Sequence, residues 1–240
     1  MFQILKTVFQ RQAFSPGVFG VLINPFYFAR HGLSTAIHDL SPSLSGKLLD
    51  VGCGTKPYQD FFDVSEYVGL DIEREGSQER SCADYLYNGD EFPFQDDKFN
   101  SVLCNQVLEH VFNPANFLSE IYRVMKPEGK LLLTVPFVWD EHEQPFDYAR
   151  YSTYGLKALL EASGFEIIEH KKLGADVTVI FQLINAYIYK VSRPLPWLLR
   201  VPLIIPVFAV VNIFGVLCKC LLPSNPDLFL DHIVLAEKRK

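Results

Sequence analysis

The run KLLDVG at residues 47–52 is an apolar segment that contains Asp50 and leads directly into Gly52 and Gly54. Glycine at such a turn permits backbone angles that are closed to other residues, and it lets the main chain approach a ligand closely. The segment therefore predicts a β-strand followed by a ligand-binding turn. Nicotinamide dinucleotide sites use the spacing G-x-G-x-x-G, but here Pro57 occupies the position of the third glycine. A nicotinamide-dependent reductase is therefore disfavoured.

Short β-rich runs alternate with helical stretches between Leu40 and Lys172. This alternation is typical of repeated βα units, which build a doubly wound α/β fold around a parallel sheet. A further strand-like run returns near the end of the chain and completes the sheet. The predicted strands are residues 47–52, 66–72, 99–105, 130–136, 165–171 and 228–238.

Two of the intervening helices carry start and stop signals. In the first, Asn113 is the expected N-cap, Pro114 stands in the first turn, and the helix ends before the sequence Pro-Glu-Gly. In the second, Ser152 or Thr153 is the expected cap and Gly164 ends the helix.

Two acids after the glycine-rich turn suit a nucleoside ligand. Asp71 lies at the end of the strand predicted at 66–72, where a carboxylate can accept hydrogen bonds from both hydroxyls of a ribose. Asp84 follows in SCADYL, where its carboxylate can accept a hydrogen bond from an adenine amino group. Together they indicate a site for an adenosine-containing ligand.

Taken in chain order, the D-x-G-x-G segment, the second-strand acid, the Ala-Asp pair and NQVLEHV resemble the class I S-adenosylmethionine-dependent methyltransferases. More narrowly, the chain is similar to the small-molecule branch often called type 11 or UbiE-like. The resemblance covers roughly residues 46–172 and the closing strand. It implies a Rossmann-like sheet of seven strands, with the last strand antiparallel beside the sixth, and S-adenosyl-L-methionine as the cofactor.

The resemblance also implies a role for each motif. Gly52 and Gly54 line the methionine moiety, Asp71 holds the ribose and Asp84 faces the adenine. A structural turn is the alternative for the two glycines. The cofactor-binding residues that we predict are Asp50, Gly52, Gly54, Asp71, Ile72, Asp84, Asn105 and Gln106.

Asn105 and Gln106 lie at the carboxyl end of the strand predicted at 99–105, where the resemblance implies that they border the methionine tail and the sulfonium. Capping of the following helix is the alternative role for both side chains. The chain departs from the family at Lys56, where many members carry a third small residue.

Methyl transfer to a hydroxyl acceptor needs a group that takes up a proton, and three side chains are candidates: His110, His142 and Tyr148. His142 lies just beyond the strand predicted at 130–136, at the edge where open α/β sheets bind ligands. An imidazole is the natural proton acceptor in such a reaction. The alternatives are a packed helix histidine for His110 and a solvated loop around His142.

The segment NQVLEHV bears on metal binding. In a metal-dependent quinone-methylating branch, the pattern E-x-x-E-H supplies carboxylates and an imidazole to a divalent ion, whereas this chain has Gln106 in place of the first acid. One carboxylate and the imidazole of His110 are too few ligands for a hard cation. We therefore predict no metal.

The charge of the chain is unevenly distributed. The net charge is −6, which argues against a nucleic-acid binder with a basic face. Between Asp39 and Asp176 there are 25 acids and 12 bases, whereas residues 177–226 contain four bases and no acid. The five cysteines form no CxxC pair and the N-terminal sequence lacks the features of a signal peptide, so a cytoplasmic protein is expected.

The acid-free stretch suits a membrane surface, a membrane span or an apolar cap. Residues 201–218 are uncharged and long enough for a transmembrane candidate. Because the strand at 228–238 rejoins the sheet, an odd number of crossings is impossible. A two-pass hairpin would place Lys190, Arg193 and Arg200 outside, against the positive-inside tendency. With Pro202 and Pro206 in the run, a segment lying on the inner membrane face is favoured.

We therefore expect a methyltransferase that acts on a small molecule, such as a lipid-linked saccharide or an isoprenoid compound, at the inner face of the membrane. The alternative is a catalytically silent methyltransferase-like membrane adaptor. No nucleic-acid partner is expected, and the oligomeric state stays open. The predicted parts are an apolar basic N-terminal arm (1–38), the cofactor-binding core (39–174), the hydrophobic insertion (175–226) and the closing strand (227–240).

Overall fold

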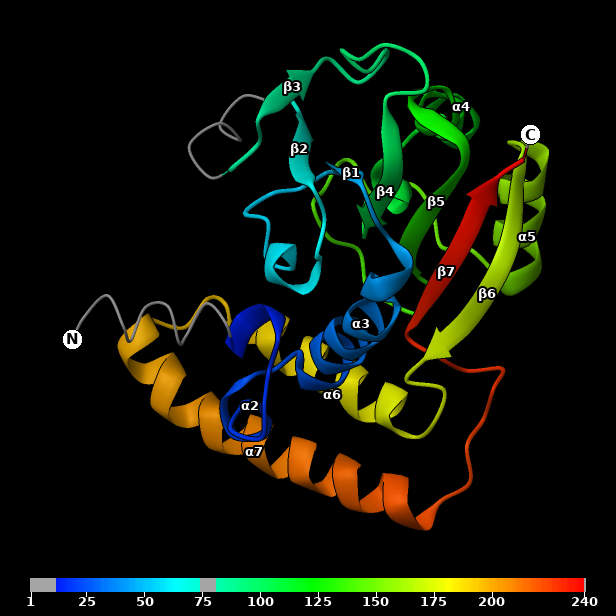
Figure 1. Ribbon diagram of the computed structural model, residues 1–240. Coiled ribbons are helices and arrows are strands. Elements are labelled where there is room, and N and C mark those ends of the chain that lie inside the picture. The colour runs from blue at the N-terminus through cyan, green and yellow to red at the C-terminus, as the bar shows by residue number, and fades with distance from the viewer. Residues whose placement is uncertain (1–11, 74–80, 240) are drawn as a thin grey trace. The chain divides into compact units, whose positions relative to one another are not determined.

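The computed structural model of the protein describes residues 12–73 and 81–239 (Figure 1). Lys6 and Arg11, two of the bases assigned to the N-terminal arm, lie outside the described residues. The described chain divides into two compact units. The sheet unit comprises Ala36–Phe137, Glu141–Lys171 and the residues from His232 onward, and the helical unit comprises the residues up to Thr35, Val138–Asp140 and Lys172–Asp231.

The sheet unit is built on a sheet of seven strands in the order β3-β2-β1-β4-β5-β7-β6. Figure 1 shows β7 running antiparallel to its neighbour β6. The predicted Rossmann-like sheet, with its last strand beside the sixth, is confirmed. The strands are β1 (Lys47–Val51), β2 (Glu66–Ile72), β3 (Tyr85–Tyr87), β4 (Phe99–Asn105), β5 (Met125–Pro136), β6 (Phe165–Leu173) and β7 (Asp231–Lys238).

The central strand β1 pairs in parallel with β2 on one side and with β4 on the other. In this register Asp50 lies between Gly69 and Leu103. Because β3 and β5 also run parallel to their neighbours β2 and β4, the carboxyl ends of five strands meet at one edge of the sheet. Ligands bind at this edge in doubly wound folds.

Strand β5 begins earlier than the predicted 130–136. Its first residues pair with the start of β4 through Phe99 and Met125, and an irregularity in register follows before Ser101 pairs with Lys130. A bulge of this kind accommodates Pro127 and Gly129, residues that disfavour a regular strand.

The helices of the sheet unit follow the capping signals. Helix α4 (Pro114–Val124) begins after Asn113, whose side chain accepts a hydrogen bond from the backbone N–H of Asn116. Helix α5 (Thr153–Ala162) begins after Ser152, which caps the N–H of Gly155. In the described part of the chain, this unit also contains three short 3-10 turns, η1 (Ser41–Ser43), η2 (Gln59–Phe61) and η3 (Leu108–His110).

The core of this unit is formed by aliphatic strand residues and a chain of aromatic rings. Phe94 and Phe99 meet edge to face with ring centroids 4.9 Å apart, and Phe92 makes the same kind of contact with Tyr87 and Phe117. Such pairs add to the free energy of burial. Through Phe92, these contacts pack α4 against the end of β3.

The helical unit contains α2 (Gly20–Ile23), most of α3 (Tyr27–Leu40), α6 (Thr178–Val191) and α7 (Trp197–Leu221). Pro202 and Pro206 lie inside α7 and do not interrupt it. Each proline removes one backbone hydrogen bond, which bends a helix more readily than it ends one. Gly215 permits close packing, since a Cβ there would lie 2.6 Å from Cζ of Phe28.

Candidate functional site

The turn after β1 has the predicted glycine conformations. Gly52 and Gly54 have φ angles of +70° and +49°, in the left-handed region that favours glycine. A Cβ at Gly52 would lie 2.4 Å from Cγ2 of Val107, so this position also needs glycine for close packing. A Cβ at Gly54 would meet nothing within 4 Å, so open space lies in front of this residue.

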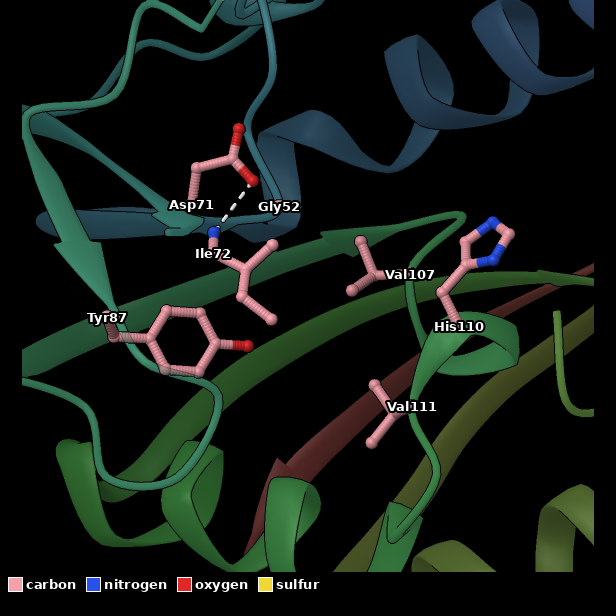
Figure 2. Close-up of a pocket in the computed structure, with 7 residues that line it drawn as sticks. All are labelled: Gly52, Asp71, Ile72, Tyr87, Val107, His110 and Val111. Carbon is pink, nitrogen blue, oxygen red and sulfur yellow. Dashed lines mark hydrogen bonds between the residues drawn. The ribbon is translucent and has the colours of Figure 1, made fainter. Parts of the chain in front are cut away.

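A pocket lies beside this turn at the carboxyl edge of the sheet (Figure 2). The side chain of Asp71 is fixed in it by two hydrogen bonds, one from the backbone N–H of Ile72 at 2.9 Å and one from the hydroxyl of Ser81 at 2.7 Å. The pocket is lined by Gly52, Asp71, Ile72, Tyr87, Val107, His110 and Val111. Four of the predicted site residues therefore come together here, although their contact with a cofactor stays a prediction.

Asp50 is buried in the middle of the sheet rather than in this pocket. Its Oδ2 accepts a hydrogen bond of 2.7 Å from the hydroxyl of Tyr67. Burial raises the pKa of Asp50 to about 7, against the opposing effects of the Tyr67 hydrogen bond and the nearby Lys56 cation. The predicted cofactor contact of Asp50 is untested, and the structure shows a second role in the packing of β1 against β2.

Asp84 lies at the amino end of β3, next to Gly69 in the middle of β2. Its Oδ2 accepts hydrogen bonds from the backbone N–H of Gly69 at 2.7 Å and from Nζ of Lys56 at 2.6 Å. Burial raises its pKa, but these two donors outweigh burial and lower it. Lys56 fits because Gly69 has no side chain, since a Cβ there would lie 2.4 Å from Cε of Lys56. The predicted contact of Asp84 with adenine stays a prediction.

The polar residue at the carboxyl end of β3 is Asn88, which the motif analysis missed. Strand β3 covers only Tyr85–Tyr87, so Asn88 follows it at the same edge of the sheet as Asp71. The ring of Tyr87 points into the pocket in Figure 2. The pattern YLYNG, an aromatic run before a polar turn, is the sequence signal that identifies this strand end.

Asn105 and Gln106 are held against β5. Oδ1 of Asn105 accepts a hydrogen bond of 2.8 Å from the hydroxyl of Thr134, and the backbone N–H of Gln106 donates to the carbonyl oxygen of Thr134 at 3.1 Å. Gln106 has a φ of +56°, so the chain turns sharply there. The next residue, Val107, lines the pocket, and the cofactor contacts of Asn105 and Gln106 stay predictions.

Three titratable groups meet where η3 approaches the loop after β5. Glu109, His110 and His142 each offer a ligand atom, and the three atoms lie within 4.8 Å of one another. Glu109 is fully buried, and the imidazole rings of the two histidines meet edge to face at 4.7 Å. Burial and the charge of Glu109 together raise the pKa of Tyr151 to about 12. Glu109 was not predicted as a site residue, because its burial depends on the fold.

The loop that carries His142 is held by an ion pair. Arg150 contacts both carboxylate oxygens of Asp147, at 2.6 and 2.7 Å, and the backbone N–H of His142 donates to the same carboxylate at 3.0 Å. Burial raises the pKa of Asp147, but these contacts outweigh it and hold the value at about 2. Tyr148 is exposed, and its ring packs against Phe112. Its predicted catalytic role stays a prediction.

The parallel sheet with its glycine turn after β1, the acid at the end of β2 and the antiparallel last strand define the class I S-adenosylmethionine-dependent methyltransferases. A family model described as a methyltransferase domain matches residues 26–170. The chain belongs to this family, as the motifs predicted.

One relative is a probable S-adenosylmethionine-dependent methyltransferase of Mycolicibacterium smegmatis. It is 30% identical over 163 residues, which are 62% of this chain and 62% of the relative. The chain spans between 40% and 62% of the length of the curated relatives it matches. The relationship therefore applies to the methyltransferase domain.

Solved structures support the fold. A phosphoethanolamine N-methyltransferase of Haemonchus contortus, in complex with S-adenosyl-L-methionine, superposes with a TM-score of 0.57 at 18% identity, covering 98% of this chain and 57% of that one. A [4+2]-cyclase superposes with a TM-score of 0.56 at 18% identity, covering 88% and 82%. Proteins named for two different reactions therefore share this fold, so the fold alone does not identify the reaction.

Proposed function

We propose that this protein transfers a methyl group from S-adenosyl-L-methionine to a small-molecule acceptor. One observation carries the proposal: the glycine turn, the carboxylate of Asp71 and the imidazole of His110 line the same pocket. The turn and the carboxylate suit the cofactor, and the imidazole lies where an acceptor would be handled. Family membership supports the choice of cofactor.

Methyl transfer asks little covalent chemistry of the protein. The acceptor displaces the sulfonium in line, and orientation alone can lower the barrier by about 7–11 kcal/mol. In this proposal Asp71 holds the ribose, and Tyr87, Val107 and Val111 form the apolar wall of the pocket. Rigid positioning of these groups by strand ends favours a reactive geometry.

The two imidazoles are proposed to handle the proton that a hydroxyl acceptor loses. Nδ1 of His110 lies 2.8 Å from the carbonyl oxygen of Phe146, so this nitrogen carries the proton and Nε2 has the free lone pair. His142 lies beside it, and Tyr148 follows in the same loop. For a hydroxyl acceptor, His142→Ala should lower turnover about 10²–10⁴-fold with cofactor affinity intact.

The test is transfer of a labelled methyl group. The purified full-length protein is incubated with methyl-labelled S-adenosylmethionine and with separate polar and lipid extracts, and labelled products are identified by mass spectrometry. The proposal predicts a labelled product that is lost in Asp71→Ala. Absence of cofactor binding by the unaltered protein at millimolar concentration would refute it, and binding without turnover on any extract would favour the silent adaptor.

A lipid-linked acceptor at a membrane surface is the finer part of the proposal, and helix α7 supports it. This helix has 25 residues and a mean hydropathy of 2.5 in its most apolar window, of which 17% is buried. Among the described residues it is the one helix long and apolar enough to cross a membrane. Its strongly exposed apolar residues include Trp197, Leu198, Leu199, Leu203, Val210, Phe214 and Leu221.

Helix lengths argue for a surface position. Helix α6 has 14 residues, or about 21 Å of length, whereas the hydrocarbon core of a bilayer is about 30 Å thick. If α7 crossed the bilayer, the chain would need a second membrane span for β7 to return to the sheet. Helix α6 is too short to be that span. Lys190, Arg193 and Arg200 at the turn between α6 and α7 suit anionic headgroups.

A further inference from the structure

We propose that Glu109, His110 and His142 form the binding site of a single divalent transition-metal ion of the zinc class. The existence of this site does not depend on methyl transfer, whereas its role in handling the acceptor rests on the function proposed above. The segment around His110 offers only two ligands, and the loop after β5 adds the third. The prediction of no metal considered one segment and a hard cation, so it did not include this arrangement.

The distances are close to those of a bound ion. One ligand atom from each residue lies within 4.8 Å of the other two. Nitrogen and oxygen ligands about 2.0–2.2 Å from a tetrahedral zinc ion are about 3.3 Å apart. Nε2 of His110 and Oε1 of Glu109 are already 3.8 Å apart. Small side-chain rotations would complete the site.

The carboxylate and the first imidazole are shielded from solvent. The side chain of Glu109 is fully buried, and that of His110 is only 10% exposed. Charges attract one another more strongly away from bulk water. A divalent ion bound by these side chains would therefore be held more firmly than one at an exposed cluster of the same residues.

The surroundings orient the imidazole of His110 in the way that metal sites require. A metal-binding histidine usually donates its other ring N–H to a carbonyl or carboxylate, which fixes the ring and its tautomer. Nδ1 of His110 lies 2.8 Å from the carbonyl oxygen of Phe146. Nδ1 of His142 lies 3.4 Å from Oδ2 of Asp147 and 3.4 Å from Nη2 of Arg150, so both residues of this ion pair hold the second ring in place.

The donor set indicates the class of ion and its use. Two imidazoles and one carboxylate are the ligands of catalytic zinc and of non-haem ferrous sites, and they leave at least one position open. Magnesium and calcium prefer sites made of oxygen ligands. Because His110 also lines the pocket with Asp71, an ion here would bind an acceptor oxygen beside the cofactor and lower its pKa.

Metal binding is measured on the purified full-length protein after chelation, with no cofactor or acceptor present. Zinc is titrated by calorimetry against a competing chelator, and cobalt(II) is added in a parallel absorption experiment. We expect one ion per chain and at least a tenfold loss of affinity in His142→Ala and Glu109→Gln. Asp147→Asn should also weaken binding, because a carboxylate that holds a metal-binding imidazole in place contributes about 10–100-fold to the affinity. The control is His38→Ala, in an exposed residue of α3, which should leave binding unchanged.

One further variant is tested by a new spectroscopic signal, because a misfolded variant would lose metal binding but would not gain such a signal. In His142→Cys, a thiolate ligand should add a charge-transfer band to the cobalt spectrum, which identifies position 142 as a ligand. Absence of stoichiometric binding in the unaltered protein, or equal affinity in His142→Ala, would overturn the metal proposal. If turnover then still depended on His142, the imidazole itself would be the base and the proposed methyl transfer would stand.

Discussion

Asp71 illustrates how single residues prepare this site. Its two carboxylate oxygens already accept hydrogen bonds from Ile72 and Ser81. These bonds fix the carboxylate at the end of β2 before any ligand binds, which lowers the entropic cost of binding. The opposite case is Asp84, whose carboxylate is bound by Lys56 and Gly69. The two carboxylates therefore have different local partners.

We predict that Asp71→Ala weakens binding of S-adenosylmethionine by about 1.5–3 kcal/mol, the range for loss of a charged hydrogen-bond partner. This corresponds to roughly a 10–150-fold increase in the dissociation constant. Calorimetry on the full-length protein measures it. The comparison variant is Asp84→Asn, which should change the affinity by less than threefold. A larger effect of Asp84→Asn than of Asp71→Ala would instead support the adenine contact of Asp84 that the sequence predicts.

Asp50 predicts a dependence of stability on pH. Its folded pKa is raised from the ordinary 3.8 to about 7, so the folded state favours the protonated carboxyl. The stability of the unliganded protein is therefore expected to fall as pH rises from about 4 to 7. Asp50→Asn removes this ionisation and keeps a partner for Tyr67.

The melting temperature of Asp50→Asn, relative to the unaltered protein, should therefore rise by at least about 3 °C between pH 5 and pH 8. Differential scanning calorimetry without cofactor measures the difference. Asp60→Asn, at an exposed position, serves as the control and should show no such trend. A difference that stays constant over this range would contradict the raised pKa.

At the scale of elements, periodicity and caps predicted most of the sheet unit. Strands β2 and β4 have the predicted bounds, and Asn113 and Ser152 cap the helices that they were expected to begin. The three-residue β3 was too short to recognise from the sequence. The meeting of His142 with Glu109 and His110 depends on tertiary packing, which no local pattern specifies.

The contact among α2, α6 and α7 shows how polar groups fix apolar helices. The side-chain amide of Asn212 donates to the carbonyl oxygens of Val21 at 2.9 Å and Asn24 at 3.0 Å. Its Oδ1 accepts a hydrogen bond of 2.8 Å from the amide of Asn185. Because Asn212 is fully buried, this arrangement specifies the pairing of helices that are otherwise mostly apolar.

We predict that Asn212→Ala lowers the free energy of unfolding of the helical unit by about 2–3 kcal/mol, since it leaves buried carbonyls and the amide of Asn185 without this partner. Thermal unfolding of the detergent-solubilised protein, combined with limited proteolysis, measures the change. Ile213→Ala, at the adjacent and more exposed position, should cost less than 1 kcal/mol. Equal effects of the two variants would show that the hydrogen bonds contribute little.

At the scale of the whole molecule, charge and apolar surface are separated along the chain. The acids are concentrated between Asp39 and Asp176. The stretch from 177 to 226 has four bases and no acid. Ion pairs bring two of these bases to acids of the helical unit, Lys190 to Asp140 and Lys219 to Asp176. Arg193 and Arg200 contact the ring of Tyr189. The basic charge thus lies at the ends of the most apolar helix.

We predict that the full-length protein floats with vesicles that contain anionic lipid and binds less to neutral vesicles, because headgroup charge and burial of apolar side chains act together. Burial of each large side chain contributes about 1.5–3 kcal/mol, so Leu203→Asp with Val210→Asp on α7 should shift most of the protein to the unbound fraction. Tyr154→Asp, at a more exposed position in the sheet unit, is the control.

Sidedness separates a surface-lying α7 from a crossing one. A cysteine at the exposed position 193, in a chain with Cys82 and Cys220 replaced by serine, is treated with a membrane-impermeant thiol reagent from outside intact cells. A surface-lying helix leaves this cysteine on the inner side and unlabelled until the cells are opened, because α6 is too short to carry the turn across the bilayer. Labelling in intact cells would establish a two-pass hairpin, and a soluble dimer without vesicle binding would assign the apolar face to a second copy of the chain.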